Sequence, residues 1–502
     1  MPAPPSPPTY ARRQPEETTL YKVVQENLAT LYGAVDDNAL AIRLPGFVRK
    51  ELEGYLECGL LCRGFARVQC GDCSKKRLVA FGCGGRGFCP SCLGRKMAQT
   101  TLNLSECVLP SEPLRQWVLT FPFAWRSRLG FDAPLFSAVT RLFVQTVLRF
   151  YTQRMKTVGR VARGQSGAVV AQQRTSSDLR LNPHLHVLFL DGVYQEEGEE
   201  VVFHALPHLS TREVGAVLES AVRRIARYLA RRGLLRGPGD SDVTDNDNDD
   251  VEPTTAQGHA ALCASAASGQ SPPAGPELRR KETKLVPLAG KPLHFDKPLC
   301  ASLDGFTLHA ATRAGGLDTR AREALLKYVL RPPIAQERVI QGPDGLVRIV
   351  LKHPFADGTV AIDLDPLSLL SRLAASVPAP RTHTVRYAGV LASASKLRSR
   401  IVPKPPVLQV AQDADESSKP KRAGCRYRSW AELLRTLGID AFACPNCGGR
   451  MRILALVRDQ DEVRRFLQAL GEPSAPPKRA PARGPPYWAS RALRIRSGAD
   501  AA

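Results

Sequence analysis

Near the start of the chain, apolar residues recur every three or four positions. Leu20, Val24, Leu28 and Leu31 follow this spacing, which is typical of an amphipathic helix, and we expect one over residues 16–35. Residues 1–15 are rich in proline and show no such period, so we expect them to be disordered.

From residue 114 onward, two kinds of hydrophobic pattern alternate. Short runs of β-branched and aromatic residues predict strands, and longer runs with a period of about 3.6 predict helices. The predicted strands are QWVLTFPF, AVVAQQR, LRLNPHLHVLFLDGVY and FTLHAATRA, and the predicted helices are SAVTRLFVQTVLRFYTQR, REVGAVLESAVRRIARYLARRGLL and residues 319–331. Pro332 and Pro333 stop the last helix, and LVRIVLKHPFADGTVAIDL has the alternation and central turn of a hairpin.

Two segments interrupt these patterns. Residues 237–276 contain DSDVTDNDNDD near their start and continue mostly in Ala, Ser, Gly and Pro. Asp250 and Ala256 stand where a calcium-binding loop requires glycine and glutamate, so we interpret the segment as a solvated linker. The resulting division is a disordered start plus helix (1–50), a cysteine-rich domain (51–105), one larger domain (106–236 and 277–402) split by the insertion (237–276), a linker (403–424), a small module around CPNC (425–460), and a helix with a basic Pro/Arg-rich tail (461–502).

The charge of the chain is strongly positive. Seventy Lys and Arg against 48 Asp and Glu give a net charge of +22. Such a surplus favours a polyanionic partner, in a large soluble protein more often nucleic acid than membrane, although a general drift towards arginine is the alternative. The N-terminus lacks the apolar core of a secretory signal, and no apolar run reaches the roughly 20 residues of a membrane span. We therefore expect a cytoplasmic protein with no membrane partner.

Seven of the 13 cysteines lie between residues 55 and 95. Cys70-x-x-Cys73 and Cys89-x-x-Cys92 are 15 residues apart, the spacing of a four-cysteine zinc site, and we expect them to bind one structural Zn²⁺. The other three, Cys83, Cys58 and Cys62, could bind a second ion, exchange with one of the four, or be buried apolar residues.

A further CxxC pair lies near the C-terminus. Cys444-Pro-Asn-Cys447 has the form of half a zinc knuckle, but no second pair follows it. A tight turn with two free thiols is the equally good interpretation.

One strand and one helix carry candidate catalytic residues. His184 and His186 are two residues apart on a predicted buried strand, so they share a face and can chelate one divalent ion; hydrogen-bonded core histidines are the alternative. Tyr328 and Arg331 share a face of the helix over residues 319–331. By itself, such a tyrosine is most often a core or surface residue.

Taken together, the cysteine module, PLRQWVLTFPF, NPHLHVLFLDGVY, LLKYVLRPPIAQERV, HPFADGTVAIDLDPLSLLSRLAASVPAPRTHTVRYAGVLA and WAELLRTLGIDAFACPNCGGRM resemble the insertion-sequence-91 family. Members of that family are rolling-circle transposases with an N-terminal zinc domain and a nuclease domain of the HUH type. The resemblance extends over about residues 50–455, with the motifs in the family's order.

The resemblance implies an α+β fold, in which an HUH core with a central antiparallel sheet and flanking helices follows a small zinc-binding domain. His184 and His186 match the pair that holds a catalytic Mg²⁺ or Mn²⁺, with His309 as a candidate third ligand. Tyr328 matches the nucleophilic tyrosine, with Arg331 or Lys327 as a nearby activating cation. Cys70, Cys73, Cys89 and Cys92 match the zinc-domain cysteines, and Cys83 stays a further candidate zinc ligand.

The implied activity is nicking of single-stranded DNA through a 5′-phosphotyrosine, followed by strand transfer. Positions four residues from Tyr328 are Ala324 and Pro332, so the chain resembles the single-tyrosine branch of the family. The partners implied are DNA and, as an open question, a second copy of the chain. The alternatives are a non-catalytic zinc-dependent DNA-binding protein, a zinc hydrolase, and a plasmid replication or conjugation nickase with the same chemistry.

Overall fold

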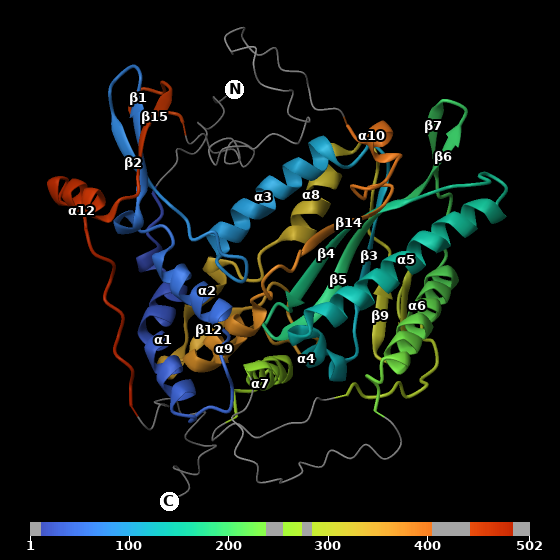
Figure 1. Ribbon diagram of the computed structural model, residues 1–502, viewed down its shortest axis with the longest axis horizontal. Helices are drawn as coiled ribbons and strands as arrows, with labels where there is room; N and C mark the ends of the chain where they lie inside the picture. The colour runs from blue at the N-terminus through green and yellow to red at the C-terminus, as the bar shows by residue number, and fades with distance from the viewer. Residues whose placement is uncertain (1–11, 237–254, 274–283, 404–441, 485–502) are drawn as a thin grey trace, which may run out of the picture.

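A computed structural model describes residues 12–236, 255–273, 284–403 and 442–484 (Figure 1). The expectations for residues 1–11, for the Asp/Asn-rich run up to residue 254, for residues 404–441 and for the tail beyond residue 484 lie outside these ranges.

The N-terminal part combines helices with a small β-sheet. Helix α1 (Thr19–Asp36) confirms the predicted helix, and its four predicted apolar positions are buried. The Thr18 hydroxyl caps α1 by accepting the Tyr21 backbone N–H. The other elements of this part are η1 (Pro15–Glu17), α2 (Gly46–Glu57), η2 (Leu61–Arg63), β1 (Phe65–Cys70), β2 (Lys76–Ala80) and α3 (Pro90–Cys107).

A seven-stranded sheet forms the centre of the molecule. Its strand order is β14-β4-β5-β3-β9-β8, with β10 beside β3, and every pairing is antiparallel. The α+β class with a central antiparallel sheet is therefore confirmed. The strands are β3 (Leu114–Thr120), β4 (Gly167–Thr175), β5 (Leu181–Leu190), β8 (Cys300–Leu303), β9 (Phe306–His309), β10 (Arg313–Ala314) and β14 (Val385–Gly389).

Helices cover both faces of this sheet (Figure 1). Helices α5 (Ala133–Thr157) and α6 (Thr211–Arg231) pack on one face, where Leu185 is fully buried. Helices α3 and α8 (Thr319–Leu330) pack on the opposite face, against residues such as Leu188. Strand β5 is thus buried on both sides, which explains its nearly continuous apolar sequence.

Helix starts and stops follow local sequence signals. The Asp132 and Asp318 carboxylates accept backbone N–H groups at the starts of α5 and α8, and Ser210 and Glu213 form a capping box at the start of α6. Helix α8 ends before Pro332, as predicted.

Smaller elements surround this core. The predicted hairpin is confirmed as β12 and β13, which pair in a three-stranded sheet with β11. The remaining elements are α4 (Phe123–Phe131), β6 (Gly192–Glu197), β7 (Glu200–Ala205), η3 (Gln336–Arg338), β11 (Val339–Gln341), η4 (Pro343–Gly345), β12 (Val347–Val350), β13 (Ala361–Leu364), α9 (Pro366–Ser376) and α10 (Arg398–Ile401).

The C-terminal segment returns to the N-terminal part. Strand β15 (Met451–Val457) pairs antiparallel with β1, and α12 (Gln460–Ala469) follows it beside η2 (Figure 1). This pairing was not predicted. The segment around CPNC, predicted as a separate module, instead contributes a strand to the small sheet of the cysteine-rich part.

One prediction about the insertion is wrong. Residues 255–268, interpreted as part of a solvated linker, form helix α7 (Thr255–Ser268). Its side chains Leu262 and Cys263 are fully buried in the same core as α1 and α9. Alanine-rich segments have high helix propensity, but their small side chains give little periodic contrast, so the sequence pattern did not reveal the buried face.

Helix α7 also buries a histidine. His259 is 8% exposed, its ring stands edge-on to Phe47, and its Nε2 has no hydrogen-bond partner among the described residues. Burial, followed by the nearby Arg174, lowers the pKa of His259 to about 4. The unfolded chain, with an ordinary histidine pKa of about 6.5, therefore binds this proton more tightly than the folded chain.

The stability contributed by neutral His259 is complete above pH 6.5, roughly, and is lost as the pH falls towards the folded-state pKa of about 4. Between pH 7 and pH 5, we expect the wild-type chain to lose about 2 kcal/mol more unfolding free energy than His259→Gln. Denaturant unfolding at the two pH values measures this difference. His294→Gln, which alters an exposed ring beside Asp296, is the control and should follow the wild-type profile. Parallel profiles for wild type and His259→Gln would contradict the assignment.

Candidate functional site

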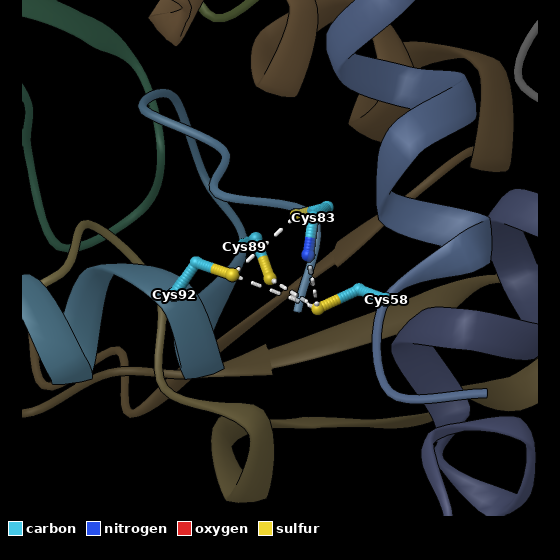
Figure 2. A group of neighbouring side chains, drawn as sticks. All are labelled: Cys58, Cys83, Cys89 and Cys92. Carbon is cyan, nitrogen blue, oxygen red and sulfur yellow. Dashed lines mark hydrogen bonds between the residues drawn. The ribbon is translucent and has the colours of Figure 1, made fainter. Parts of the chain in front are cut away.

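Four cysteines from separate segments meet beside helix α3 (Figure 2). We call Cys58, Cys83, Cys89 and Cys92 the first cysteine group; their sulfur atoms all lie within 4.8 Å of one another. Cys58 follows α2, Cys83 and Cys89 lie between β2 and α3, and Cys92 is in the first turn of α3.

A second cysteine group consists of Cys70, Cys73, Cys444 and Cys447, with the same closeness of its sulfur atoms. The predicted single site of Cys70, Cys73, Cys89 and Cys92 is therefore wrong as a set, because its two CxxC pairs belong to different groups. Cys70 and Cys73 lie at the turn of the β1–β2 hairpin, whereas Cys89 and Cys92 lie at the start of α3. Cys62 joins neither group and is buried in an apolar cluster with Phe65.

The first group fits a tetrahedral zinc ion. Its thiols are free, and the Sγ–Sγ distances are 3.6 Å for Cys58–Cys92, 3.5 Å for Cys83–Cys92 and 3.6 Å for Cys58–Cys89. Zn–S bonds of about 2.3 Å in a tetrahedron require sulfur atoms about 3.8 Å apart. Four soft ligands leave no open position, so a zinc ion here has a structural role.

The two predicted histidines lie side by side on β5. His184 and His186 share a face of the strand, and their ring centroids are 5.0 Å apart. Leu185 and Val187 point to the opposite face and are fully buried, as the alternation predicted. The His184–His186 face is the one that α8 covers.

Hydrogen bonds at Nδ1 orient both rings. The His184 Nδ1 lies 2.6 Å from the Asn182 carbonyl oxygen and donates to it, which leaves Nε2 as the free acceptor. The Gln116 Nε2 lies 2.6 Å from the His186 Nδ1, so its N–H donates to that ring nitrogen and the proton of the neutral His186 ring is on Nε2. Rotation of the Gln116 amide by half a turn would present its oxygen to Nδ1 instead and free the Nε2 lone pair for a metal ion. No pattern in the sequence marked Gln116 as a hydrogen-bond partner of His186.

Both histidines are held neutral. Burial, followed by the proximity of His184 and Arg331, lowers the pKa of His186 to about 3. Burial is also the main reason that the pKa of His184 is lowered. Neutral imidazoles are the form that binds metal, so the pair is able to act as ligands at neutral pH.

Tyr328 of α8 lies next to this pair. Its ring centroid is 5.7 Å from that of His186, at an interplanar angle of 80°. The side chain is 41% exposed, so a large substrate can reach the phenol. The amide of Gln173 on β4 donates to the Val329 carbonyl oxygen (2.7 Å) and ties the end of α8 to the sheet.

Cations surround the tyrosine. The Arg331 guanidinium lies 4.6 Å and the Lys352 ammonium 5.4 Å from the Tyr328 ring centroid. Lys327, the other cation considered from the sequence, pairs instead with Glu323 at 2.6 Å. Lys352 was missed because it lies in the turn after β12, where no local pattern marks it.

His309 lies on β9, two strands away from the histidine pair. Val118 of β3 is the register partner of both His186 and His309, so the three residues share one sheet face. Adjacent strands are about 4.8 Å apart, which places the His309 backbone roughly 10 Å from that of His186. Among the described residues, only the two cysteine groups bring three or more possible metal ligands together, so the structure does not assemble His309 with the pair.

Two family models match the chain. The model described as "Transposase zinc-binding domain" matches residues 34–121, which include the first cysteine group, and the model described as "Putative transposase" matches residues 167–398, which include the histidine pair and Tyr328. The fold and these matches define a transposase, a DNA-processing enzyme whose substrate is DNA, with an N-terminal zinc-binding domain. The chain belongs to the insertion-sequence-91 family of transposases. No curated protein and no solved structure matches it.

None of the described helices is both long enough and apolar enough to cross a bilayer.

A buried carboxylate anchors the end of the strand that carries the histidines. Asp191, directly after β5, is fully buried and accepts two hydrogen bonds from the Arg115 guanidinium, at 2.8 and 3.0 Å. Arg313 of β10 donates to the same carboxylate at 2.6 Å, and the Tyr151 hydroxyl of α5 donates at 3.2 Å. The carboxylate therefore joins β3, β5, β10 and α5.

Asp191→Asn leaves Arg115 as a buried cation without its counter-charge. We expect the unfolding free energy to fall by about 3–5 kcal/mol, measured by denaturant unfolding. Glu196→Gln is the matched control, because it removes the exposed ion pair with Arg400 and should cost less than about 1 kcal/mol. Equal losses for the two variants would show that Asp191 has no anchoring role.

Proposed function

We propose that the chain nicks single-stranded DNA at the ends of its own mobile element and transfers the strand, in a rolling-circle type of transposition. Tyr328 is the proposed nucleophile, and residues 106–236 and 277–402 form the proposed HUH nuclease domain. The observation that carries the proposal is the exposed Tyr328 ring beside the buried His186, with the partly buried His184 next to it on the same strand face.

The histidine pair is suited to hold the catalytic ion. His184 and His186 lie side by side on one strand face, with ring centroids 5.0 Å apart, and can hold one ion through Nε2 when the Gln116 amide oxygen faces the His186 Nδ1. A divalent ion, Mg²⁺ or Mn²⁺, supplies charge neutralisation at the scissile phosphate when it is bound there. His309 remains the proposed third ligand from the sequence.

The cations around Tyr328 can bind the DNA backbone. Burial is the first cause of the lowered pKa of Lys352 and of Arg338; Arg331 lowers both further, and Arg338 also lowers the pKa of Lys352, so the three cations lie close together. Arg126 and Arg331 also face His184. Arginine and lysine side chains in this arrangement neutralise a phosphate and the charge that develops on it.

In the proposed reaction, the Tyr328 oxygen attacks the phosphorus atom in line with the leaving 3′ oxygen. The phenol loses its proton as the O–P bond forms, and the 3′ oxygen takes up a proton as the P–O3′ bond breaks. The products are a 5′-phosphotyrosine and a free 3′-OH. Attack by a 3′-OH on the phosphotyrosine reverses these bond changes and joins the strand without a nucleotide cofactor.

The proposal is tested with labelled single-stranded oligonucleotides from the element ends and Mn²⁺. We expect the wild-type chain to form an adduct that survives denaturation, and Tyr328→Phe to form none while it still binds the oligonucleotides. Tyr387→Phe is the matched control, since Tyr387 also lies under an arginine, Arg398, but on β14. An adduct formed by Tyr328→Phe would falsify the assignment, and turnover without any adduct would favour a hydrolase.

The roles of the cations are tested by the rate of adduct formation in a single turnover. We expect Arg331→Ala combined with Lys352→Ala to slow the step by about 100-fold or more, because both groups lie beside the reacting phenol. Lys327→Ala is the control from the same helix and should react at nearly the wild-type rate, because Lys327 pairs with Glu323. A similar loss of rate in Lys327→Ala and in the double variant would indicate that these cations attract DNA in general and do not act on the reacting phenol.

A further inference from the structure

The second cysteine group joins two segments that are far apart in the sequence. Cys70 and Cys73 flank the turn between β1 and β2, whereas Cys444 and Cys447 lie in the turn before β15. The Sγ atoms of Cys70 and Cys447 are 3.5 Å apart, and so are those of Cys73 and Cys444. Each of these short distances therefore joins one cysteine of the first segment to one of the second, as expected where each segment supplies two of four ligands.

The backbone around these cysteines is arranged as in a zinc knuckle. The Gly448 N–H donates to the Cys444 carbonyl oxygen at 2.9 Å, and Gly448 has a φ of 71°, which glycine adopts without strain. The Asp72 N–H points to the Cys70 sulfur at 3.4 Å. A Cβ on Gly449 would meet the end of the exposed Asp72 side chain, so the two turns approach each other closely here.

The sulfur positions fit a tetrahedral ion. Distances of 3.5 Å are close to the roughly 3.8 Å expected around Zn²⁺ with four thiolates. All four thiols are free. Four sulfur ligands favour zinc, since hard cations such as Mg²⁺ prefer oxygen.

Apolar packing at this junction is slight. Among the described residues, the buried cluster around the group consists of Val68, Cys70, Cys444 and Met451, with Cys73, Val79 and Phe442 packed against it. Along β15, Ile453, Leu454 and Leu456 are each more than half exposed. A separate apolar cluster with Val457, Val463 and Leu467 holds the far end of β15 and α12, so the cysteine end of β15 is the part that a metal ion would stabilise.

We propose that Cys70, Cys73, Cys444 and Cys447 bind a second zinc ion, separate from the one at the first cysteine group, which fastens β15 and α12 to the N-terminal sheet. The ion closes the loop of chain that contains the whole catalytic sheet. It thereby holds the C-terminal segment in register on β1, Cys70 opposite Met451 and Phe65 opposite Val457. This inference does not depend on the proposed nicking reaction.

The first test uses the unaltered, zinc-replete protein and thiol alkylation followed by peptide mapping. Cys447 is exposed, so as a free thiol it would react quickly, whereas a zinc-bound thiolate is protected. We expect Cys447 to stay unmodified until the zinc is removed with a chelator. Cys263, fully buried in the core, is the internal control and should react only on unfolding. Rapid alkylation of Cys447 in the folded, zinc-replete chain overturns the proposal.

The second test counts metal ions by mass spectrometry of the purified chain. We expect two zinc ions in the wild type, one in Cys444→Ser/Cys447→Ser, and two in Cys447→His, because histidine can replace a cysteine ligand. Cys300→Ser, on β8 outside both groups, is the matched control and should keep two. Two zinc ions in the folded double variant overturn the proposal, as does a wild type with a single zinc or with iron.

Amide hydrogen exchange shows which strands lose protection when the second cysteine group is altered. In the double variant, we expect the amides of β15 to exchange faster while those of β5 keep their wild-type protection, since β5 is held by the central sheet. Unchanged protection of β15 overturns the fastening role. If the double variant does not fold, the alkylation test on the unaltered protein still decides the proposal.

Discussion

The burial of β5 on both faces is the constraint on which the rest of the structure depends. The strand lies between β4 and β3 in the middle of the sheet, and alternate side chains enter two different cores. A shift by one residue would turn the histidines into the core beneath α5 and α6 and bring Leu185 under α8. The buried Asp191–Arg115 pair fixes the end of the strand, and the same register fixes the site.

The candidate site needs buried histidines and an exposed tyrosine next to each other. Burial keeps His184 and His186 neutral and therefore able to bind an ion, whereas exposure of Tyr328 leaves its phenol open to a large substrate. The end of α8 satisfies both, because its inner side chains enter the core and Tyr328 lies at the edge of the histidine face. Arg331 and Lys352 then add positive charge where a phosphate has to bind.

The cysteine-rich part contains a small sheet with little apolar core. Its sheet has three short strands, of which β15 comes from the far end of the chain, and the buried clusters on that sheet are small. The second cysteine group lies beside this sheet, where there is little apolar core, whereas the first group borders the large core that contains α1 and α9. Local spacing predicted Cys70, Cys73, Cys89 and Cys92 as metal ligands and left Cys444 and Cys447 open. It could not tell which pairs meet, because each pair offers the same two thiolates to any partner.

Local patterns were sufficient for features that depend on near neighbours. The i, i+2 spacing of His184 and His186 put them on one strand face, helical spacing put Arg331 beside Tyr328, and Pro332 marked the end of α8. Only the tertiary structure decided the contacts between distant segments. These include Gln116 behind His186, Lys352 over Tyr328, the buried helix α7, and the pairing of Cys70 and Cys73 with Cys444 and Cys447. Periodicity records which side of an element is buried, whereas the partner on that side depends on how the whole chain packs.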